Sequence, residues 1–353
     1  MTNTENRKRE TLGSLCVLAA AFLALVASGC RTAQPLSLWN DEAPAKKALI
    51  EYVASVTDSR SPDFVPAKDR IAVFDLDGTL FCETAPTYFD WLLFEHRVLK
   101  DSSFTPTEEQ RTTAVNARAT GKWPGVTEAR ERMVAAAYRG FTPEGFERYA
   151  KAFMDEPQPG FSGMKRGEAF YRPMVEVVEF LVRNGFTVYV ISGSNRLVVR
   201  ALVKGTLPLP PRQVIGSDTA FAAEGQGDAH PLDYTFKKGE NPVLSGKFQT
   251  KCLQMNKVSA IVREIGDRPL LSFGNSMTDA SMCNYALCGG KRAGLAFMLV
   301  CDDTTREYGN PAKAEAMRKA CAENGWIPVS MRDDWKTIYG DGVRRTQLPT
   351  YAQ

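Results

Sequence analysis

Short apolar runs alternate with amphipathic segments along most of the chain. The apolar runs have the length of buried strands, and the segments between them repeat apolar residues with helical spacing. The pattern predicts strands at 71–74, 187–191, 214–215, 270–273, 295–300 and 326–329, and helices at 174–183, 195–203, 258–265 and 312–323. Strands that alternate with helices are typical of an α/β fold with a doubly wound, mostly parallel sheet.

Two segments interrupt this alternation. Residues 85–164 contain four helical patterns, at 88–99, 107–119, 127–139 and 143–154, and no strong strand. Thr107, Thr127 and Thr142 stand where helix N-caps are expected, and Pro143 suits a first helical residue. We therefore expect a helical insertion of about eighty residues after the first strand. Residues 218–255 are rich in turn residues and predict a hairpin or a long loop near the edge of the sheet.

The first thirty residues have the pattern of a targeting segment. A basic stretch at 7–9 precedes residues 12–29, which carry no charge. This is typical of a secretory signal peptide, although an uncleaved membrane anchor fits the same pattern. Residues 26–30, Val-Ala-Ser-Gly-Cys, resemble the lipobox of bacterial lipoproteins, which implies that Cys30 is lipidated. We expect a signal peptide at 1–29, a tether at 30–38, and an exported protein held on a membrane by this lipid, facing the periplasm or the cell surface.

The composition narrows the possible chemistry. The 353 residues include 44 Lys and Arg, 41 Asp and Glu and two His, and the net charge of +3 is too small to indicate a nucleic-acid-binding protein. The isolated His96 and His230 favour neither a histidine metal site nor a Ser-His-Asp triad. Hydrolysis would depend on carboxylates, lysine, hydroxyl groups or a metal with oxygen ligands. Cysteines at 82, 252, 283, 288, 301 and 321 could pair or stay free, and the sequence does not choose.

The strongest chemical signal follows the first predicted strand. Residues 75–80 are Asp-Leu-Asp-Gly-Thr-Leu, so two carboxylates lie at the carboxyl end of a strand, where open α/β sheets bind ligands. One of Asp75 and Asp77 can attack a substrate while the other transfers protons. Gly78 allows backbone N–H groups to approach an anion. An Asp-Gly turn without catalytic meaning gives the same pattern.

Three further polar groups follow at strand ends or helix starts. Residues 192–194, Ser-Gly-Ser, suit a phosphate site or an ordinary turn. Asn275 and Asp279 offer the oxygen ligands that Mg²⁺ takes, although Asn275 also suits an N-cap. Lys257 stands at the start of the helix that precedes the strand predicted at 270–273. There its ammonium group would either reach an anion at the strand ends or be solvated. Lys247 and Lys251 are rival candidates for this lysine.

The order of these motifs resembles that of the haloacid dehalogenase (HAD) superfamily: Asp-x-Asp-Gly-Thr, then Ser, then Lys, then Gly-Asn-x-x-x-Asp. The resemblance covers most of the chain and implies a HAD-like Rossmannoid core at 39–82 and 165–353, with a helical type-1 cap at 83–164. Residues 171–174, Tyr-Arg-Pro-Met, and 306–308, Arg-Glu-Tyr, also resemble an exported bacterial subgroup likened to phosphoserine and phosphocholine phosphatases. The acid at Asp77 favours a phosphatase, since dehalogenases of this superfamily lack it.

The resemblance implies a mechanism. Asp75 would attack phosphorus and form an aspartyl-phosphate, and Asp77 would protonate the leaving alcohol and then activate water. The implied phosphate-binding residues are Gly78, Thr79, Ser192, Gly193 and Lys257, and the implied Mg²⁺ ligands are Asp75, Asp77 through its carbonyl, Asn275 and Asp279. Asn275 stands where many relatives carry Asp. A metal with a lysine supplies the charge stabilisation on which phosphoryl transfer depends.

The cap is expected to choose the substrate. Glu83, Tyr88 and Trp91 would suit an amine-bearing phosphomonoester, although packing in a cap core is the more common role of two aromatic residues at helical spacing. Arg196 would contact phosphate or cover a helix surface. The expected function is Mg²⁺-dependent hydrolysis of a small phosphorylated metabolite such as phosphoserine or phosphocholine, with no nucleic-acid partner and no obligate protein partner. The alternatives are a phosphomutase and a ligand-binding lipoprotein on a degenerate scaffold.

Overall fold

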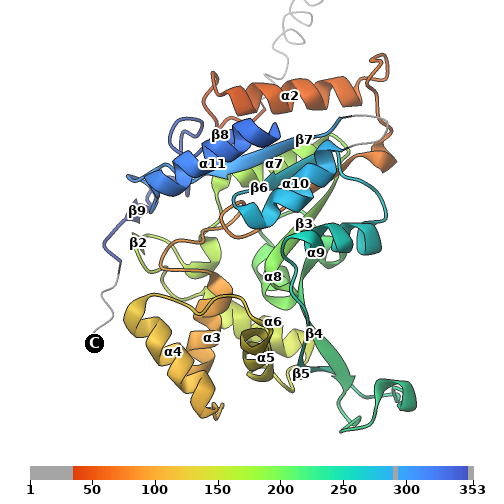
Figure 1. Ribbon diagram of the computed structural model, residues 1–353, viewed down its shortest axis with the longest axis vertical. Coiled ribbons are helices and arrows are strands. Elements are labelled where there is room, and N and C mark those ends of the chain that lie inside the picture. The colour runs from red at the N-terminus through yellow and green to blue at the C-terminus, as the bar shows by residue number, and fades with distance from the viewer. Residues whose placement is uncertain (1–34, 289–292, 349–353) are drawn as a thin grey trace, which may run out of the picture. The chain divides into compact units, whose positions relative to one another are not determined.

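The computed structural model describes residues 35–288 and 293–348 (Figure 1). The predicted signal peptide and the predicted lipidation site at Cys30 lie outside these ranges. The fold below is that of the unit that begins at Leu38. Among the described residues, no helix is both long and apolar enough to cross a membrane.

Seven strands form the central sheet, in the order β5-β4-β3-β1-β6-β7-β8. Neighbouring strands are parallel except for β4 and β5. Every residue of the central strand β1 is buried, which explains its uninterrupted apolar sequence. The strands are β1 (Ile71–Phe74), β3 (Thr187–Asn195), β4 (Val214–Ala223), β5 (Pro242–Thr250), β6 (Leu271–Gly274), β7 (Leu295–Val300) and β8 (Ile327–Ser330). The predicted doubly wound, mostly parallel sheet is confirmed.

Helices cover both faces of this sheet (Figure 1). α9 (Met255–Ala260), α10 (Ala280–Leu287) and α11 (Pro311–Asn324) share apolar clusters with β1 and β7 on one face. α7 (Arg172–Arg183) and α8 (Arg196–Val203) lead from β1 to β3 and from β3 to β4, and the right-handed crossover rule puts them on the other face. α2 (Pro44–Thr57), which the apolar pattern did not predict, packs near β8.

Four helices follow β1 and lie together, as expected for the insertion at 85–164. They are α3 (Phe89–Leu99), α4 (Glu108–Thr120), α5 (Glu128–Ala136) and α6 (Pro143–Met154). The predicted N-caps are present: Thr107, Thr127 and Thr142 each accept a backbone N–H of the first turn. α5 ends before the predicted 139, because the chain turns there to meet β5. Below, α3 to α6 are called the cap helices.

The predicted edge hairpin is formed by β4 and β5, and it contacts the cap helices (Figure 1). Leu244 of β5 exchanges two backbone hydrogen bonds with the loop before α6, one from Gly140 and one to Phe141, each of 2.8 Å. Lys251 binds Glu131 of α5 at 3.0 Å. The hairpin therefore ties the cap helices to the edge of the sheet.

Some element boundaries differ from the sequence prediction. β3 runs to Asn195 instead of ending at 191, and β4 has ten residues instead of two, because both strands continue beyond their apolar core into pairing with β4 and β5. The helix predicted at 258–265 is α9 followed by a π-helical turn, Ile261–Ile265. Short 3₁₀ segments lie at Ala67–Asp69, Arg166–Glu168, Pro211–Gln213, Pro231–Asp233 and Met277–Asp279, and β2 (Phe161–Ser162) pairs with β9 (Arg344–Arg345).

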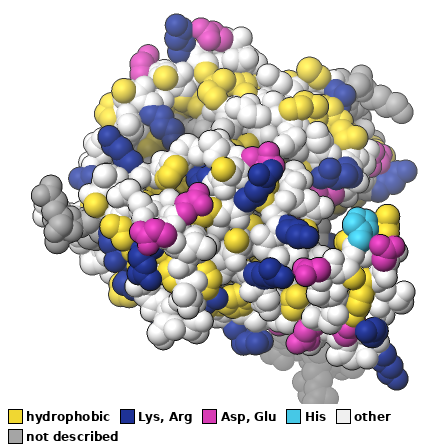
Figure 2. Space-filling view, turned by 60° about the horizontal axis from the view of Figure 1, so that its bottom comes forward, with side chains coloured by type: hydrophobic (Ala, Val, Ile, Leu, Met, Phe, Trp, Pro, Cys, Tyr) yellow, Lys and Arg dark blue, Asp and Glu magenta, His cyan; other side chains and the backbone are white. Residues whose placement is uncertain are grey.

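The six described cysteines are all free thiols, so none of the open disulfide pairings is formed. On the face in Figure 2, basic and acidic side chains are interspersed with apolar ones.

Candidate active site

The loop after β1 is held against the loop after β6. Asp75 donates its N–H to the carbonyl of Phe273 over 2.9 Å, so the carboxyl ends of the two neighbouring strands stay together. Gly78 has a φ of +80°, and a Cβ on it would come within 1.9 Å of Asn275 Nδ2. Only glycine permits both this backbone conformation and this close approach. The Asp75–Gly78 loop and Asn275 thereby form one wall.

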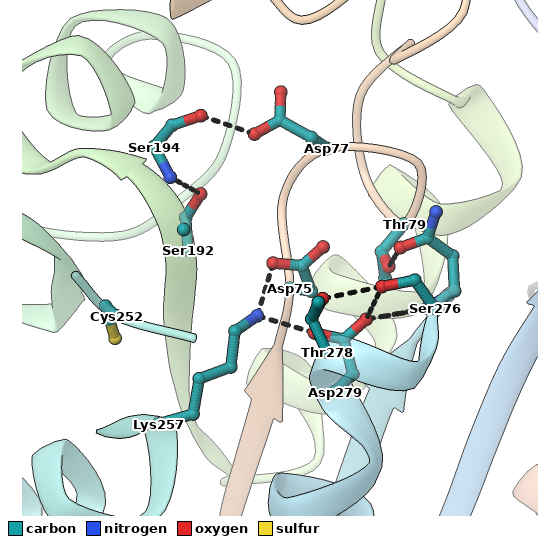
Figure 3. Close-up of polar contacts among 12 residues, drawn as sticks. Asp75, Asp77, Thr79, Ser192, Ser194, Cys252, Lys257, Ser276, Thr278 and Asp279 are labelled. Atoms are coloured by element: carbon teal, nitrogen blue, oxygen red, sulfur yellow. Dashed lines mark hydrogen bonds and ion pairs between the residues drawn. The ribbon is translucent and has the colours of Figure 1, made fainter. Parts of the chain in front are cut away.

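A buried lysine joins two of the predicted carboxylates (Figure 3). Lys257 Nζ lies 2.5 Å from Asp75 Oδ1 and 2.6 Å from Asp279 Oδ1. Lys257 and Asp279 are fully buried. Burial opposes the charged ammonium, but the two carboxylates outweigh it and raise the pKa of Lys257. The ammonium therefore stays charged beside the predicted nucleophile.

Asp279 holds the loop that follows β6. Its Oδ2 accepts the N–H groups of Asn275 and Ser276, both at 3.1 Å, while its Oδ1 accepts from Lys257. A Cβ on Gly274 would lie 2.6 Å from the Asp279 Cβ, so this side chain fills the space under the strand end. Because both oxygens accept hydrogen bonds, Asp279 positions Lys257 and the backbone of the loop after β6.

Asp77 lies on the opposite side of the loop, where it contacts Ser194 (Figure 3). Ser194 Oγ donates to Asp77 Oδ2 over 2.7 Å, and Asp77 Oδ1 is buried with no hydrogen-bond partner among the described residues. Burial raises the pKa of Asp77 to about 7, although the Ser194 hydrogen bond lowers it; Asp90 and Glu83 raise it further. A carboxyl group with such a pKa can give and take protons near neutral pH.

Asp75, Asp77, Ser194 and Asn275 line a cavity of about 230 Å³ between the sheet edge and the cap helices. This volume lies below the range of roughly 300–1,000 Å³ for drug-sized ligands, so the cavity suits a small metabolite. The lining residues are Asp75, Asp77, Glu83, Tyr88, Asp90, Trp91, Val126, Arg130, Gly193, Ser194, Lys251, Leu253, Asn275, Ser276 and Thr278.

The predicted substrate residues of the cap do line this cavity. Tyr88 and Trp91 pack edge to face with ring centroids 4.7 Å apart, and the Arg130 guanidinium lies 5.1 Å from the Trp91 ring. Glu83 accepts from Lys313 of α11 over 2.5 Å, which partly neutralises its charge. The two aromatic residues thus pack against each other and also form part of the cavity wall.

Other predicted residues lie elsewhere. Ser192 and Thr79 are fully buried and do not line the cavity. Arg196 binds Asp218 through two hydrogen bonds of 2.7 Å and also binds Glu264, so its guanidinium is engaged outside the cavity. Of the rival lysines, Lys247 is exposed and Lys251 pairs with Glu131 at the cavity wall.

Three of the cavity residues that the sequence prediction missed are Ser194, Asp90 and Arg130. Ser194 was visible as the second serine of the Ser-Gly-Ser run, but the first serine was chosen as the phosphate contact. Asp90 accepts the N–H of Asn195 over 3.0 Å and so helps to join the cap to the core, whereas Arg130 pairs with Glu131 within α5. No local pattern marks Asp90 or Arg130, because their roles depend on how α3 and α5 pack.

The donor set at the cavity fits a hard metal ion. The oxygen-bearing side chains of Asp75 and Asn275 both line it. No group of three His, Cys, Asp or Glu residues is placed for a metal in the part of the chain that the structure describes. Mg²⁺ commonly takes only one or two carboxylates and keeps several waters, so this small set of oxygen ligands suits it better than Zn²⁺.

Comparison with protein families matches residues 72–283, more than half of the chain, to the haloacid dehalogenase-like hydrolases. The chain belongs to this family. The predicted HAD membership is therefore confirmed, and the matched region contains Asp75, Asp77, Lys257 and Asp279.

Comparison with solved structures gives matches to this HAD hydrolase at low sequence identity. A protein of unknown function from Anaerococcus prevotii is 13% identical with a TM-score of 0.50, over 81% of this chain and 91% of that chain. Cytosolic 5'-nucleotidase IIIB, bound to cytidine, is 14% identical with a TM-score of 0.47, over 85% and 89%. A substrate-bound phosphoserine phosphatase is 16% identical with a TM-score of 0.38, over 75% and 94%. Comparison with curated proteins gives no match.

Proposed function

We propose that this HAD hydrolase removes the phosphoryl group from a small phosphomonoester through an aspartyl-phosphate on Asp75. The observation that carries the proposal is the placement of two different carboxyl groups on one cavity wall. Asp75 is paired with the charged Lys257, whereas Asp77 keeps one oxygen without a partner among the described residues. One carboxylate is thus suited to attack and the other to transfer protons.

The first step transfers the phosphoryl group to the enzyme. An Asp75 carboxylate oxygen forms a bond to phosphorus while the bond between phosphorus and the alcohol oxygen breaks. Asp77 gives its proton to that alcohol oxygen, so the alcohol leaves neutral. Lys257, 2.5 Å from Asp75, offsets the negative charge that gathers when a phosphate approaches a carboxylate.

The second step releases phosphate. A water molecule attacks phosphorus, the bond to Asp75 breaks, and Asp77 accepts the proton that the water loses. The same carboxyl group can serve both steps because its pKa of about 7 lets it exist in both protonation states near neutral pH. Mg²⁺ held by Asp75, the Asp77 carbonyl and Asn275 would supply further charge neutralisation for the phosphoryl oxygens.

The cavity favours a small alcohol with a positively charged group. Tyr88 and Trp91 offer aromatic surface and Asp90 adds a carboxyl group at the same wall, where Glu83 is already paired with Lys313. Aromatic faces and carboxylates attract ammonium groups. We therefore include phosphoserine, phosphoethanolamine and phosphocholine among the candidate substrates.

The proposed location of the protein is outside the cytoplasm, where a lipid on Cys30 would hold it on a membrane. Replacement of Cys30 by Ser should then release the protein from the membrane fraction.

The test is phosphate release by residues 31–353, with and without a chelator. The substrates would be p-nitrophenyl phosphate, the three amine-bearing phosphomonoesters, nucleoside monophosphates and sugar phosphates. We expect Mg²⁺-dependent turnover that Asp75→Asn abolishes. A folded protein that binds these compounds but releases no phosphate would instead support a binding lipoprotein, and isomerisation of a sugar phosphate without release would support a phosphomutase.

A further inference from the structure

The backbone that carries Ser194 is fixed from three sides. Ser192 Oγ accepts the N–H of Ser194 over 3.0 Å. The carbonyl of Gly193 accepts the hydroxyl of Ser217 over 2.6 Å. A Cβ on Gly193 would come within 2.5 Å of Leu253 Cδ2, so this stretch is also packed against the segment before α9. The Ser194 side chain is therefore presented to the cavity from a rigid support.

The two oxygens of Asp77 are not equivalent. Oδ2 accepts the Ser194 hydroxyl over 2.7 Å, whereas Oδ1 is buried and has no partner among the described residues. Both side chains are more than nine-tenths buried, so water does not compete freely for this contact. Oδ1 therefore keeps its full capacity to hold or accept a proton, while one acceptor position of Oδ2 is taken by Ser194.

We propose that Ser194 is a positioning residue that orients Asp77 so that Oδ1 exchanges the proton with the leaving alcohol and then with water. This inference rests on the proposed phosphatase activity. In the first step the proton passes from Asp77 Oδ1 to the alcohol oxygen as the bond between that oxygen and phosphorus breaks. In the second it returns from water to Oδ1. Ser194 keeps its own proton throughout, and Ser192 acts by holding the backbone of Ser194.

The test compares two substrates that differ in their need for an acid. Nitrophenolate leaves p-nitrophenyl phosphate without being protonated, whereas the alkoxide of an alkyl phosphate such as phosphoethanolamine needs the proton of Asp77. For Ser194→Ala we expect kcat/KM to fall about tenfold or more on the alkyl phosphate and less than about threefold on p-nitrophenyl phosphate, since general acids contribute most to poor leaving groups. Ser194→Thr keeps the hydroxyl and should restore most of the loss.

Two controls distinguish a positioning role of Ser194 from a general loss of structure in the variant. Ser245→Ala removes a hydroxyl that donates to the Ala220 carbonyl over 2.8 Å in the hairpin, and should behave as wild type on both substrates. In the Asp77→Asn background, Ser194→Ala should cause no further loss, because residues that act through one another are not additive. Equal losses on both substrates, or fully additive losses in the double variant, would overturn the inference. A folded wild-type protein that hydrolyses neither substrate would refute the proposed function itself, and the inference with it.

Discussion

The sheet edge and the cap wall of the cavity are specified in different ways. Asp75 and Asn275 follow the parallel strands β1 and β6, so the direction of the strands alone brings them to one edge. On the cap wall, Trp91 lies under Arg130, and Lys251 reaches Glu131 from the hairpin. These contacts depend on how helices and hairpin pack. The comparison teaches that topology sets the chemistry of this site, whereas tertiary packing sets the surface that faces the substrate.

The largest expected effect concerns the buried lysine at the sheet edge. Lys257→Met would leave the carboxylates of Asp75 and Asp279 without their cation in a buried site. We expect a loss of about 3–5 kcal/mol in the free energy of unfolding, because breaking a buried ion pair leaves unpaired charge. Phosphate release should fall by about a thousandfold or more, since the charge next to the nucleophile is no longer offset. Urea unfolding and a phosphate assay measure the two effects.

Lys247→Met is the matched control for this change, because Lys247 is exposed on the hairpin. It should alter stability by less than about 0.5 kcal/mol and leave turnover unchanged. If Lys247→Met lost as much activity as Lys257→Met, the assignment of the lysine at the sheet edge would have to be abandoned.

The second prediction uses the raised pKa of Asp77 and concerns stability. Burial raises this pKa from 3.8 to about 7, so between those values the folded protein binds a proton that the unfolded chain does not. Stability therefore falls as the pH rises from about 4 to about 7. Asp77→Asn cannot ionise and should exceed wild type by about 1–4 kcal/mol at pH 8, with the advantage vanishing near pH 4.

Urea unfolding at pH 4, 6 and 8 measures this difference, with the exposed Asp341→Asn as a control that should show no such trend. The variant would be more stable but inactive toward alkyl phosphates, as expected where an active site keeps a buried charge at the cost of stability. A variant less stable than wild type at pH 8 would contradict the desolvation argument.

The third prediction tests the close packing of the two loops at the sheet edge. Gly78→Ala would place a methyl group on Asn275 and force a positive φ on alanine. We expect a loss of about 1–3 kcal/mol in the free energy of unfolding and at least about a tenfold loss of turnover, because Asn275 must move. Gly266→Ala shares the positive φ, at +84°, but has no atom within 4 Å of its Cβ. Gly266→Ala should lower the free energy of unfolding by about 1 kcal/mol and leave turnover unchanged. Equal effects of the two variants on turnover would exclude a role for Asn275 in the reaction.

What the sequence could predict also differs between the sheet edge and the cap wall. The strands, the doubly wound sheet and the HAD family could be predicted, because short apolar runs and the residues after them carry that information locally. Ser194 could not be separated from Ser192 by sequence, since their order within Ser-Gly-Ser does not reveal which hydroxyl faces the cavity. The continuation of β3 to Asn195 decides this, and it depends on pairing with β4. Asp90 and Arg130 required the packing of the cap helices, which no local pattern encodes.

The smallest expected effect concerns Arg196, which the sequence placed near phosphate or on a helix surface. The guanidinium binds Asp218 and Glu264 and does not line the cavity. Arg196→Lys would replace a planar two-pronged donor by a single ammonium, so about 1 kcal/mol of stability should be lost from this partly exposed network. KM and kcat should stay within about twofold of wild type, because a pair outside the cavity contributes equally to free enzyme and transition state. An increase of tenfold or more in KM for every phosphomonoester would mean that Arg196 leaves its carboxylates to bind phosphate. Arg196 would then have to be counted among the residues of the active site.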